Sequence, residues 1–319
     1  MIKTAEFVSP KHPDKICDFI ADSILDAYLE GDKDSRVAIE VMGGHNLITI
    51  NGEVTSHAKP DISILVRGIV GEDYKIISNI VAQSPEIARG VDTGGAGDQG
   101  IMKGYATSET PEYLPLEYIL ARDLCKKVFE VYPYDGKTQV TVKDGKVTTV
   151  VASFQNTKND ELLKLVQSII PANEYLINPA GEWHQGGFDS DTGLSGRKLV
   201  IDNYGPEISI GGGSFSGKDY TKVDRSAAYM ARRIAVELLE KRKAKEVYTK
   251  LAYAIGKKEP VMAVAVIVYP GQNGGDGVEE EVTGYDLSPK GIREYLKLDQ
   301  VKFADTSQWG HFGRGFEWR

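Results

Sequence analysis

Apolar and polar positions follow two different periods along the chain, and the resulting pattern occurs three times. Spacings of three to four residues predict helices, and alternation predicts strands. The predicted elements are, in chain order, a helix at 14–29, strands at 37–42 and 47–54 and a helix at 62–81; a helix at 116–131, strands at 139–142 and 146–154 and a helix at 160–170; then a helical pattern at 225–254, a strand at 261–269 and a short helix near 289–298. The Asp144-Gly145 turn between the middle strands is a typical hairpin signal.

This order of elements predicts an α+β protein built from three similar units. Runs of strands before each returning helix favour sheets with helices on one face over a parallel, doubly wound sheet. Because helix–strand alternation is common and the three matches share no residue identity, an unrepeated α+β chain stays open as the alternative.

Composition and charge exclude several classes of protein. The chain has 319 residues, enough for a large core, and its net charge is −8, from 38 Lys plus Arg against 46 Asp plus Glu. A net-acidic chain lacks the basic surface that binds nucleic acids or anionic membranes. Its longest apolar run, Val261–Tyr269, is far shorter than the ~20 residues of a membrane helix. No signal-peptide core follows Met1, and Cys17 and Cys125 lie far apart, so we expect a cytoplasmic protein with buried, reduced thiols.

Glycine is concentrated in two short windows. Of 34 glycines, six lie in residues 90–104 and five in residues 205–217. The second window nearly matches a P-loop, but Asp219 stands where the motif needs Ser or Thr to hold magnesium. The first contains G-x-G-x-x-G, yet no strand-like segment precedes it, so the Rossmann context is missing. Glycines mixed with acids, amides and lysines favour a ligand site, with flexible surface loops as the alternative.

Charged residues near the second window suit a phosphate-bearing ligand. Lys218, Lys222 and Asp224 lie at its end or just beyond it, and Arg197 and Lys198 precede it. Cationic side chains beside exposed backbone amides bind phosphate oxygens, and an aspartate among them suits Mg²⁺.

A second candidate group stands at a predicted helix start, in the sequence His12-Pro13-Asp14-Lys15. Proline pre-sets the first turn and the helix dipole keeps Asp14 ionised, although Asp14 taken alone is better explained as a helix cap. The next carboxylates, Asp18, Asp22 and Asp26, repeat at i,i+4 spacing and predict a solvent-exposed acidic face.

Seven motifs, in order, resemble those of the S-adenosylmethionine synthetase (methionine adenosyltransferase) family. They are HPDK at 12–15, GAGDQGIMKGY at 95–105, GLSGRK at 193–198, GGGSFSGKD at 211–219, KVDRSAAY at 222–229, AYAIG at 252–256 and GHFGR at 310–314. The resemblance covers nearly the whole chain. It implies three intertwined α+β domains related by pseudo-threefold symmetry, each a sheet with helices on one face, which we place at 1–100, 110–186 and 187–319.

The resemblance also implies a reaction and an assembly. Methionine sulfur attacks C5′ of ATP, and the released triphosphate is hydrolysed to diphosphate and phosphate. The family resemblance implies a homodimer with active sites at the subunit interface, often paired into tetramers. Two Mg²⁺ per site and K⁺ are the implied cofactors.

The residues implied by this resemblance form four sets. The catalytic set is His12, Lys137, Arg197, Lys218 and Lys222; the ATP-binding set adds Trp183, Asp191 and Lys198; the methionine-binding set is Glu53, Gln83, Asp98, Asp191, Lys222 and Ile255; the metal ligands are Asp14 and Asp224 for Mg²⁺ and Glu40 for K⁺. Trp183, where the family commonly has Phe, would stack on adenine.

The chain departs from the family pattern in two places near the implied site. Lys11 stands where Gly is usual, and the segment 83–95, which forms a mobile loop over the active site in the family, is shorter. Two other hypotheses stay open. One is a P-loop-like ATPase or kinase that uses residues 212–218 and forms ADP without methionine. The other is a homologue without catalytic activity.

Overall fold

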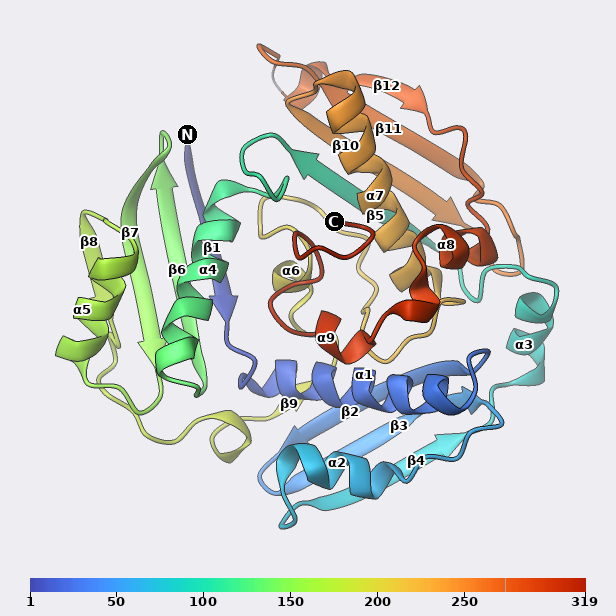
Figure 1. Ribbon diagram of the computed structural model, residues 1–319, viewed down its shortest axis with the longest axis horizontal. Helices are drawn as coiled ribbons and strands as arrows, with labels where there is room; N and C mark the ends of the chain where they lie inside the picture. Colours follow the sequence, from blue (N-terminus) through green and yellow to red (C-terminus); the bar gives the residue numbers. More distant parts are fainter. Residues whose placement is uncertain (273) are drawn as a thin grey trace.

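The computed structural model describes residues 1–272 and 274–319 and contains three four-stranded sheets. Figure 1 shows the three sheets arranged separately around the middle of the molecule. Loops of the yellow part of the chain and the red C-terminal segment fill this centre, and the C-terminus lies within the ring of sheets. Segments far apart in the sequence therefore meet between the three sheets.

The first sheet, at the bottom of Figure 1, has the strand order β4-β3-β2-β9. Its strands are β2 (Arg36–Gly44), β3 (Leu47–Thr55), β4 (Lys75–Val81) and β9 (Gly193–Leu194), and its helices are α1 (Pro13–Gly31) and α2 (Ile62–Val70). The predicted helix over 62–81 is wrong in its second half, because β4 pairs in parallel with β3. Gly71, with φ of +107°, ends α2, and the isoleucines that follow favour a strand.

The second sheet has the order β1-β6-β7-β8. Its strands are β1 (Ile2–Val8), β6 (Gly136–Lys143), β7 (Lys146–Phe154) and β8 (Glu174–Ile177), and its helices are α4 (Leu116–Val131) and α5 (Asn159–Ile169). The predicted hairpin is confirmed, since Asp144 and Gly145 join β6 to β7 with φ values of +50° and +78°.

The third sheet has the order β12-β11-β10-β5. Its strands are β5 (Gly100–Thr107), β10 (Glu246–Tyr253), β11 (Met262–Val268) and β12 (Val278–Glu281), and its helices are α7 (Val223–Arg242) and α8 (Pro289–Tyr295). The helical pattern predicted over 225–254 is wrong beyond Arg242. Lys243 takes a left-handed conformation at the helix end, and β10 follows.

The three-domain α+β fold is confirmed, and the chain exchanges strands between sheets. β1 joins the second sheet, β5 joins the third and β9 returns to the first. The linear ranges 1–100, 110–186 and 187–319 stay a prediction. Short elements complete the fold: α3 (Pro85–Asp92), η1 (Gly187–Asp189), α6 (Leu199–Asp202), η2 (Gly274–Asp276), η3 (Leu298–Gln300) and α9 (Phe303–Thr306).

Two predictions about buried groups have opposite outcomes. Cys17 and Cys125 are buried free thiols, as expected. The exposed acidic face on α1 is wrong: Asp18 and Asp22 are fully buried and Asp26 is half-buried. These carboxylates accept main-chain N–H groups from distant segments, which compensates for their removal from water. Within the two described ranges, no helix is long and apolar enough to cross a bilayer.

Candidate active site

His12 caps the N-terminus of α1. Its Nδ1 accepts the N–H of Asp14 at 3.2 Å, so the neutral ring carries its proton on Nε2. The side chain is buried, and this burial together with the charges of Lys198 and Lys137 lowers its pKa to about 4. At neutral pH, His12 is therefore an uncharged hydrogen-bond donor in a cationic environment.

Asp14 is not the helix cap, so its carboxylate is available for other contacts. One oxygen accepts the N–H of Leu194 at 2.8 Å, and the other accepts Lys198 Nζ at 2.5 Å. Arg197 Nε lies 3.9 Å from the first oxygen. Burial opposes ionisation, but the Lys198 and Leu194 hydrogen bonds outweigh it and hold the pKa of Asp14 below its usual range. We call His12, Asp14, Arg197 and Lys198 the His12 group.

A second cluster stands before and at the start of α7. Lys218 Nζ lies 2.8 Å from Asp224, and Lys222 Nζ lies 2.8 Å from Asp219. Asp219 also accepts the N–H groups of Val37 and Thr221. These four charged residues, Lys218, Asp219, Lys222 and Asp224, form the Lys218 group.

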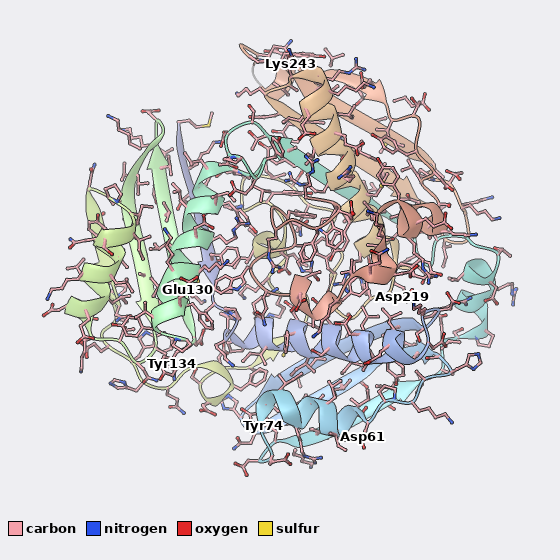
Figure 2. The ribbon with its side chains drawn as sticks, in the orientation of Figure 1. Asp61, Tyr74, Glu130, Tyr134, Asp219 and Lys243 are labelled. Atoms are coloured by element: carbon pink, nitrogen blue, oxygen red, sulfur yellow. The ribbon has the colours of Figure 1, made fainter. Side chains whose placement is uncertain are left out.

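The place of Asp219 explains why the P-loop match fails. The residue is fully buried, and Figure 2 shows it well inside the molecule, whereas Asp61 and Lys243 lie at the rim. Its two oxygens accept hydrogen bonds from main-chain N–H groups and from Lys222, so Asp219 stabilises the loop before α7. Helix α7 begins only at Val223, four residues after the position at which a P-loop requires Ser or Thr.

The two glycine windows are sites of close main-chain packing. A Cβ on Gly213 would lie 2.2 Å from the Asp224 carboxyl carbon, and one on Gly95 would lie 2.3 Å from the Gly256 carbonyl oxygen. Gly97 N–H donates to Thr221 O at 3.2 Å, next to Lys222. The first window therefore packs against both the Lys218 group and the loop that carries Ile255.

Strand β2 connects the two charged groups. Ala38 bridges to Lys218, and Met42 pairs with Leu194, whose N–H holds Asp14. Four residues of strand separate these contacts, a span of about 13 Å. Glu40 lies between them, on the same face, and accepts the hydroxyl of Ser195 at 2.5 Å. Glu40 is thus placed between the His12 group and the Lys218 group.

The other predicted site residues lie around these two groups. Lys137 is exposed on β6, and Asp191 is exposed before β9; the charges of both act on the His12 ring. Glu53 pairs across the sheet with Ala38. Within the described residues, no hydrogen bond or ion pair joins Glu53 or Asp98 to the His12 group.

Three residues assigned to substrate recognition are only partly covered by protein. Trp183 is half-buried, and its Nε1 donates to Ser153 Oγ at 3.2 Å and Asn178 Oδ1 at 3.3 Å. Ile255 is 52% exposed. Gln83 Oε1 is buried and finds no hydrogen-bond partner among the described residues. An orphaned buried oxygen is costly, so it suits a donor supplied by a ligand.

Sequence reasoning missed Ser195 and the structural role of Asp219. Ser195 Oγ both donates to Glu40 and accepts the N–H of Val41 at 3.0 Å, so it fixes Glu40 to the strand. Its signal was present, since Ser195 stands inside the GLSGRK motif. The contact of Asp219 with Val37 has no local signal, because the two residues lie 182 positions apart.

The described residues hold no cluster of three or more His, Cys, Asp or Glu side chains that could bind a metal alone. Asp14 and Asp224 instead stand singly, each paired with a lysine. This donor set fits Mg²⁺, which typically binds one or two carboxylates plus phosphate oxygens and water.

Comparisons with known proteins agree along the chain. Family models match in order: S-adenosylmethionine synthetase N-terminal domain at residues 1–86, central domain at 93–183 and C-terminal domain at 185–319. The S-adenosylmethionine synthase of Mycoplasmopsis pulmonis is 42% identical over 98% of this chain and 93% of its own, and that of Thermus thermophilus is 40% identical over 99% and 94%. A solved structure, described as an unusual S-adenosylmethionine synthetase from Campylobacter jejuni, matches with a TM-score of 0.86 and 32% identity over 99% of this chain and 96% of its own.

Proposed function

This chain belongs to the S-adenosylmethionine synthetase family, and we propose that it transfers the adenosyl group by direct attack of the methionine sulfur on C5′ of ATP. The released triphosphate is then hydrolysed to diphosphate and phosphate. The observation that carries this proposal is the His12 group, which places a buried, neutral imidazole beside an ionised carboxylate and two cations at one helix start. We place the reaction in the cytoplasm, in keeping with two buried free thiols.

The chemistry explains why no general base is needed. A thioether sulfur has a free electron pair and no proton to lose, so the S–C5′ bond forms as the C5′–O bond breaks. The electron pair of the broken bond stays on the triphosphate, and a sulfonium remains on the adenosyl product. The protein must align the reacting atoms and stabilise charge on the leaving oxygen.

The cationic residues have this second task. His12 donates Nε2–H toward the oxygen that leaves C5′, and its low pKa keeps it neutral at working pH. Lys137, Arg197 and Lys198 bind phosphate oxygens from this side. Lys218 and Lys222, near the Ala38 end of β2, bind phosphate oxygens as well. The five positive charges together neutralise the triphosphate as it forms.

Mg²⁺ and K⁺ complete the charge balance. Asp14 and Asp224 would each hold one Mg²⁺ together with phosphate oxygens, and Glu40 would hold K⁺. Bound Mg²⁺ polarises the phosphates and offsets their charge. The lysines now paired with Asp14 and Asp224 would turn toward the phosphates.

Methionine and adenosine contacts come from the remaining residues. Glu53, Asp98 and Asp191 supply carboxylates for the methionine ammonium and the ribose hydroxyls, and the unpartnered Gln83 Oε1 supplies an acceptor. Ile255 lines the sulfur side, and Trp183 stacks on adenine, since indole offers a large π-face.

A second copy of the chain completes the site. One face of the first sheet packs on α1, while the other carries Met42, Ile77, Val81 and Leu194, each more than a third exposed. The strand register puts Glu40 and Glu53 on this same face. An apolar face around site carboxylates fits an isologous homodimer, and two such dimers could pair into a tetramer.

Sedimentation equilibrium tests the dimer. Ile77→Lys should dissociate it, and Leu176→Lys on the second sheet should not.

The reaction is tested with purified protein, ATP, methionine, Mg²⁺ and K⁺. Mass spectrometry should detect the sulfonium product, with one phosphate and one diphosphate per turnover. Lys218→Met should abolish most product, and Lys243→Met, at the rim in Figure 2, should not. ADP formed without methionine would instead favour an ATPase or kinase, and absence of any turnover in a folded dimer would favour the inactive homologue.

A further inference from the structure

Four carboxylates on one side of α1 form a row, Asp14, Asp18, Asp22 and Asp26, and each accepts main-chain N–H groups from outside the helix. The donors are Leu194 for Asp14, Gly196 for Asp18, Gly217 for Asp22, and Phe303 and Ala304 for Asp26, all at 2.8 Å. We call these residues the carboxylate row. Three of its four members hold loops that carry phosphate-binding candidates.

Asp18 holds the loop that carries Arg197 and Lys198. One oxygen accepts Gly196 N–H, directly before these two cations, and the other accepts Lys15 Nζ at 2.9 Å. Lys15 is itself buried and also binds Asp202, at the end of α6. The loop is thereby fixed to α1 immediately before its two phosphate-binding candidates.

Asp22 holds the loop that carries Lys218. It accepts Gly217 N–H and makes two hydrogen bonds with Arg225, at 2.6 and 3.0 Å. Arg225 in turn donates to Lys218 O at 3.1 Å. The buried Asp22–Arg225 pair thus binds the main chain on both sides of the Lys218 Cα.

We propose that Asp18 and Asp22 are positioning residues for the triphosphate, a role that rests on the proposed function. Neither side chain reaches the substrate, because both are fully buried and their oxygens accept from main-chain N–H groups and from the buried Lys15 and Arg225. Each instead fixes one cationic loop to α1, Asp18 the loop that carries Arg197 and Lys198 and Asp22 the loop that carries Lys218. Misplacement of such groups by about 1 Å can cost up to 10²-fold in rate.

Asp26 supplies a matched control within the same row. It lies on the same helix side and accepts two main-chain N–H groups, but those belong to α9, and neither α9 nor its N-cap Lys302 is among the phosphate-binding candidates. A role in folding alone would make all three carboxylates equivalent. A positioning role separates Asp18 and Asp22 from Asp26.

The experiment measures binding of inorganic tripolyphosphate with Mg²⁺ by calorimetry, together with the KM values for ATP and methionine. Asp18→Ala should weaken tripolyphosphate binding about tenfold or more and raise the ATP KM, with the methionine KM within about twofold. Asp18→Asn, which keeps an acceptor for Gly196, should recover part of the loss. Asp26→Asn should leave both substrate constants unchanged.

The Asp22 site is tested in the double variant Asp22→Asn/Arg225→Met, which leaves no unpaired buried charge. Melting and sedimentation must first show folded dimers. Wild-type tripolyphosphate affinity in a folded Asp18→Ala protein, or an equal loss in Asp26→Asn, overturns the positioning role. A different result separates the two proposals. If the variants change tripolyphosphate binding as expected but the wild-type protein forms no sulfonium, the proposed function is overturned and the positioning role stands.

Discussion

The two ends of the carboxylate row carry the same residue type on the same helix side, in different surroundings. Asp14 meets the ammonium of Lys198 and lies beside His12. Asp26, at the far end, accepts the N–H groups of Phe303 and Ala304 and borders a cavity of about 540 Å³ that neither site group lines. Sequence spacing makes the two ends equivalent, and tertiary contacts make them different.

The pKa directions of these two residues show what causes the difference. Burial raises the pKa of both carboxyls. At Asp14, the Lys198 and Leu194 hydrogen bonds outweigh burial, and the pKa falls below its usual range. At Asp26, the two N–H groups do not outweigh it, and the pKa rises to about 6. The hydrogen-bonded ammonium of Lys198 therefore distinguishes Asp14 from Asp26.

Asp14→Asn gives the largest expected effect. The amide keeps the size of the side chain but removes the charge that would hold Mg²⁺ and pair with Lys198. We expect kcat for sulfonium formation to fall by about 10³-fold, in the range measured for loss of a preorganised charged or hydrogen-bonding group. Quantitative mass spectrometry of the product measures the loss. A rate within tenfold of wild type would contradict the metal assignment.

Substitution of His12 should have the next largest effect. His12→Ala removes the Nε2–H donor and should lower kcat by about 10²-fold, with a smaller change in the ATP KM, because the bond strengthens as the oxygen gains charge. His12→Asn keeps an N–H donor and should recover part of the rate. Single-turnover kinetics separates this step from product release. A wild-type rate for His12→Ala would contradict the donor role.

The sequence predicts much of the fold and fails where distant contacts decide. Helices α1, α4 and α5 and the β6–β7 hairpin follow from periodicity and turn chemistry. The errors at 62–81 and 225–254 arise because an apolar run does not show where a helix ends. Gly71 was a local stop signal, whereas Lys243, a good helix former, gave none. No periodicity reveals that β1 pairs with β6, more than a hundred residues later.

The candidate site likewise has residues that the sequence predicts and residues that only distant contacts determine. Local motifs mark His12, Asp14, Lys198, Lys218 and Asp224, and the structure brings them into two ion-paired groups. The carboxylate row is misjudged because a solvated face and a face buried against N–H donors have the same spacing. A second cue was present: Ile16, Phe19, Ile20 and Ile24 leave α1 little polar surface beyond the row, as expected of a helix in the interior.

The free energy of unfolding below neutral pH should depend on His12. Its pKa is about 4 in the folded protein and 6.5 ordinarily, so the unfolded chain binds more protons between these values. Wild-type stability relative to His12→Asn should therefore fall as pH drops from 6.5 through 4, by up to roughly 3 kcal/mol. Urea unfolding at pH 7.5, 6, 5 and 4.5 measures it. A constant difference between the two proteins would contradict the low pKa.

Asp26→Asn should have the smallest effect, and in the opposite pH direction. Since the folded pKa of about 6 lies above the ordinary 3.8, the folded protein binds more protons in this window, and stability from Asp26 falls as pH rises through it. The advantage of wild type over Asp26→Asn should therefore shrink by about 1 to 2 kcal/mol between pH 4.5 and 7, because solvent reaches this half-buried carboxyl. The amide offers one acceptor to two N–H donors, which adds a loss of stability at every pH.

Urea unfolding at both pH values, with kcat as the internal control, tests this end of the carboxylate row. An advantage that grows with pH, or a lowered kcat, would make Asp26 resemble Asp14 and remove the contrast between the two ends.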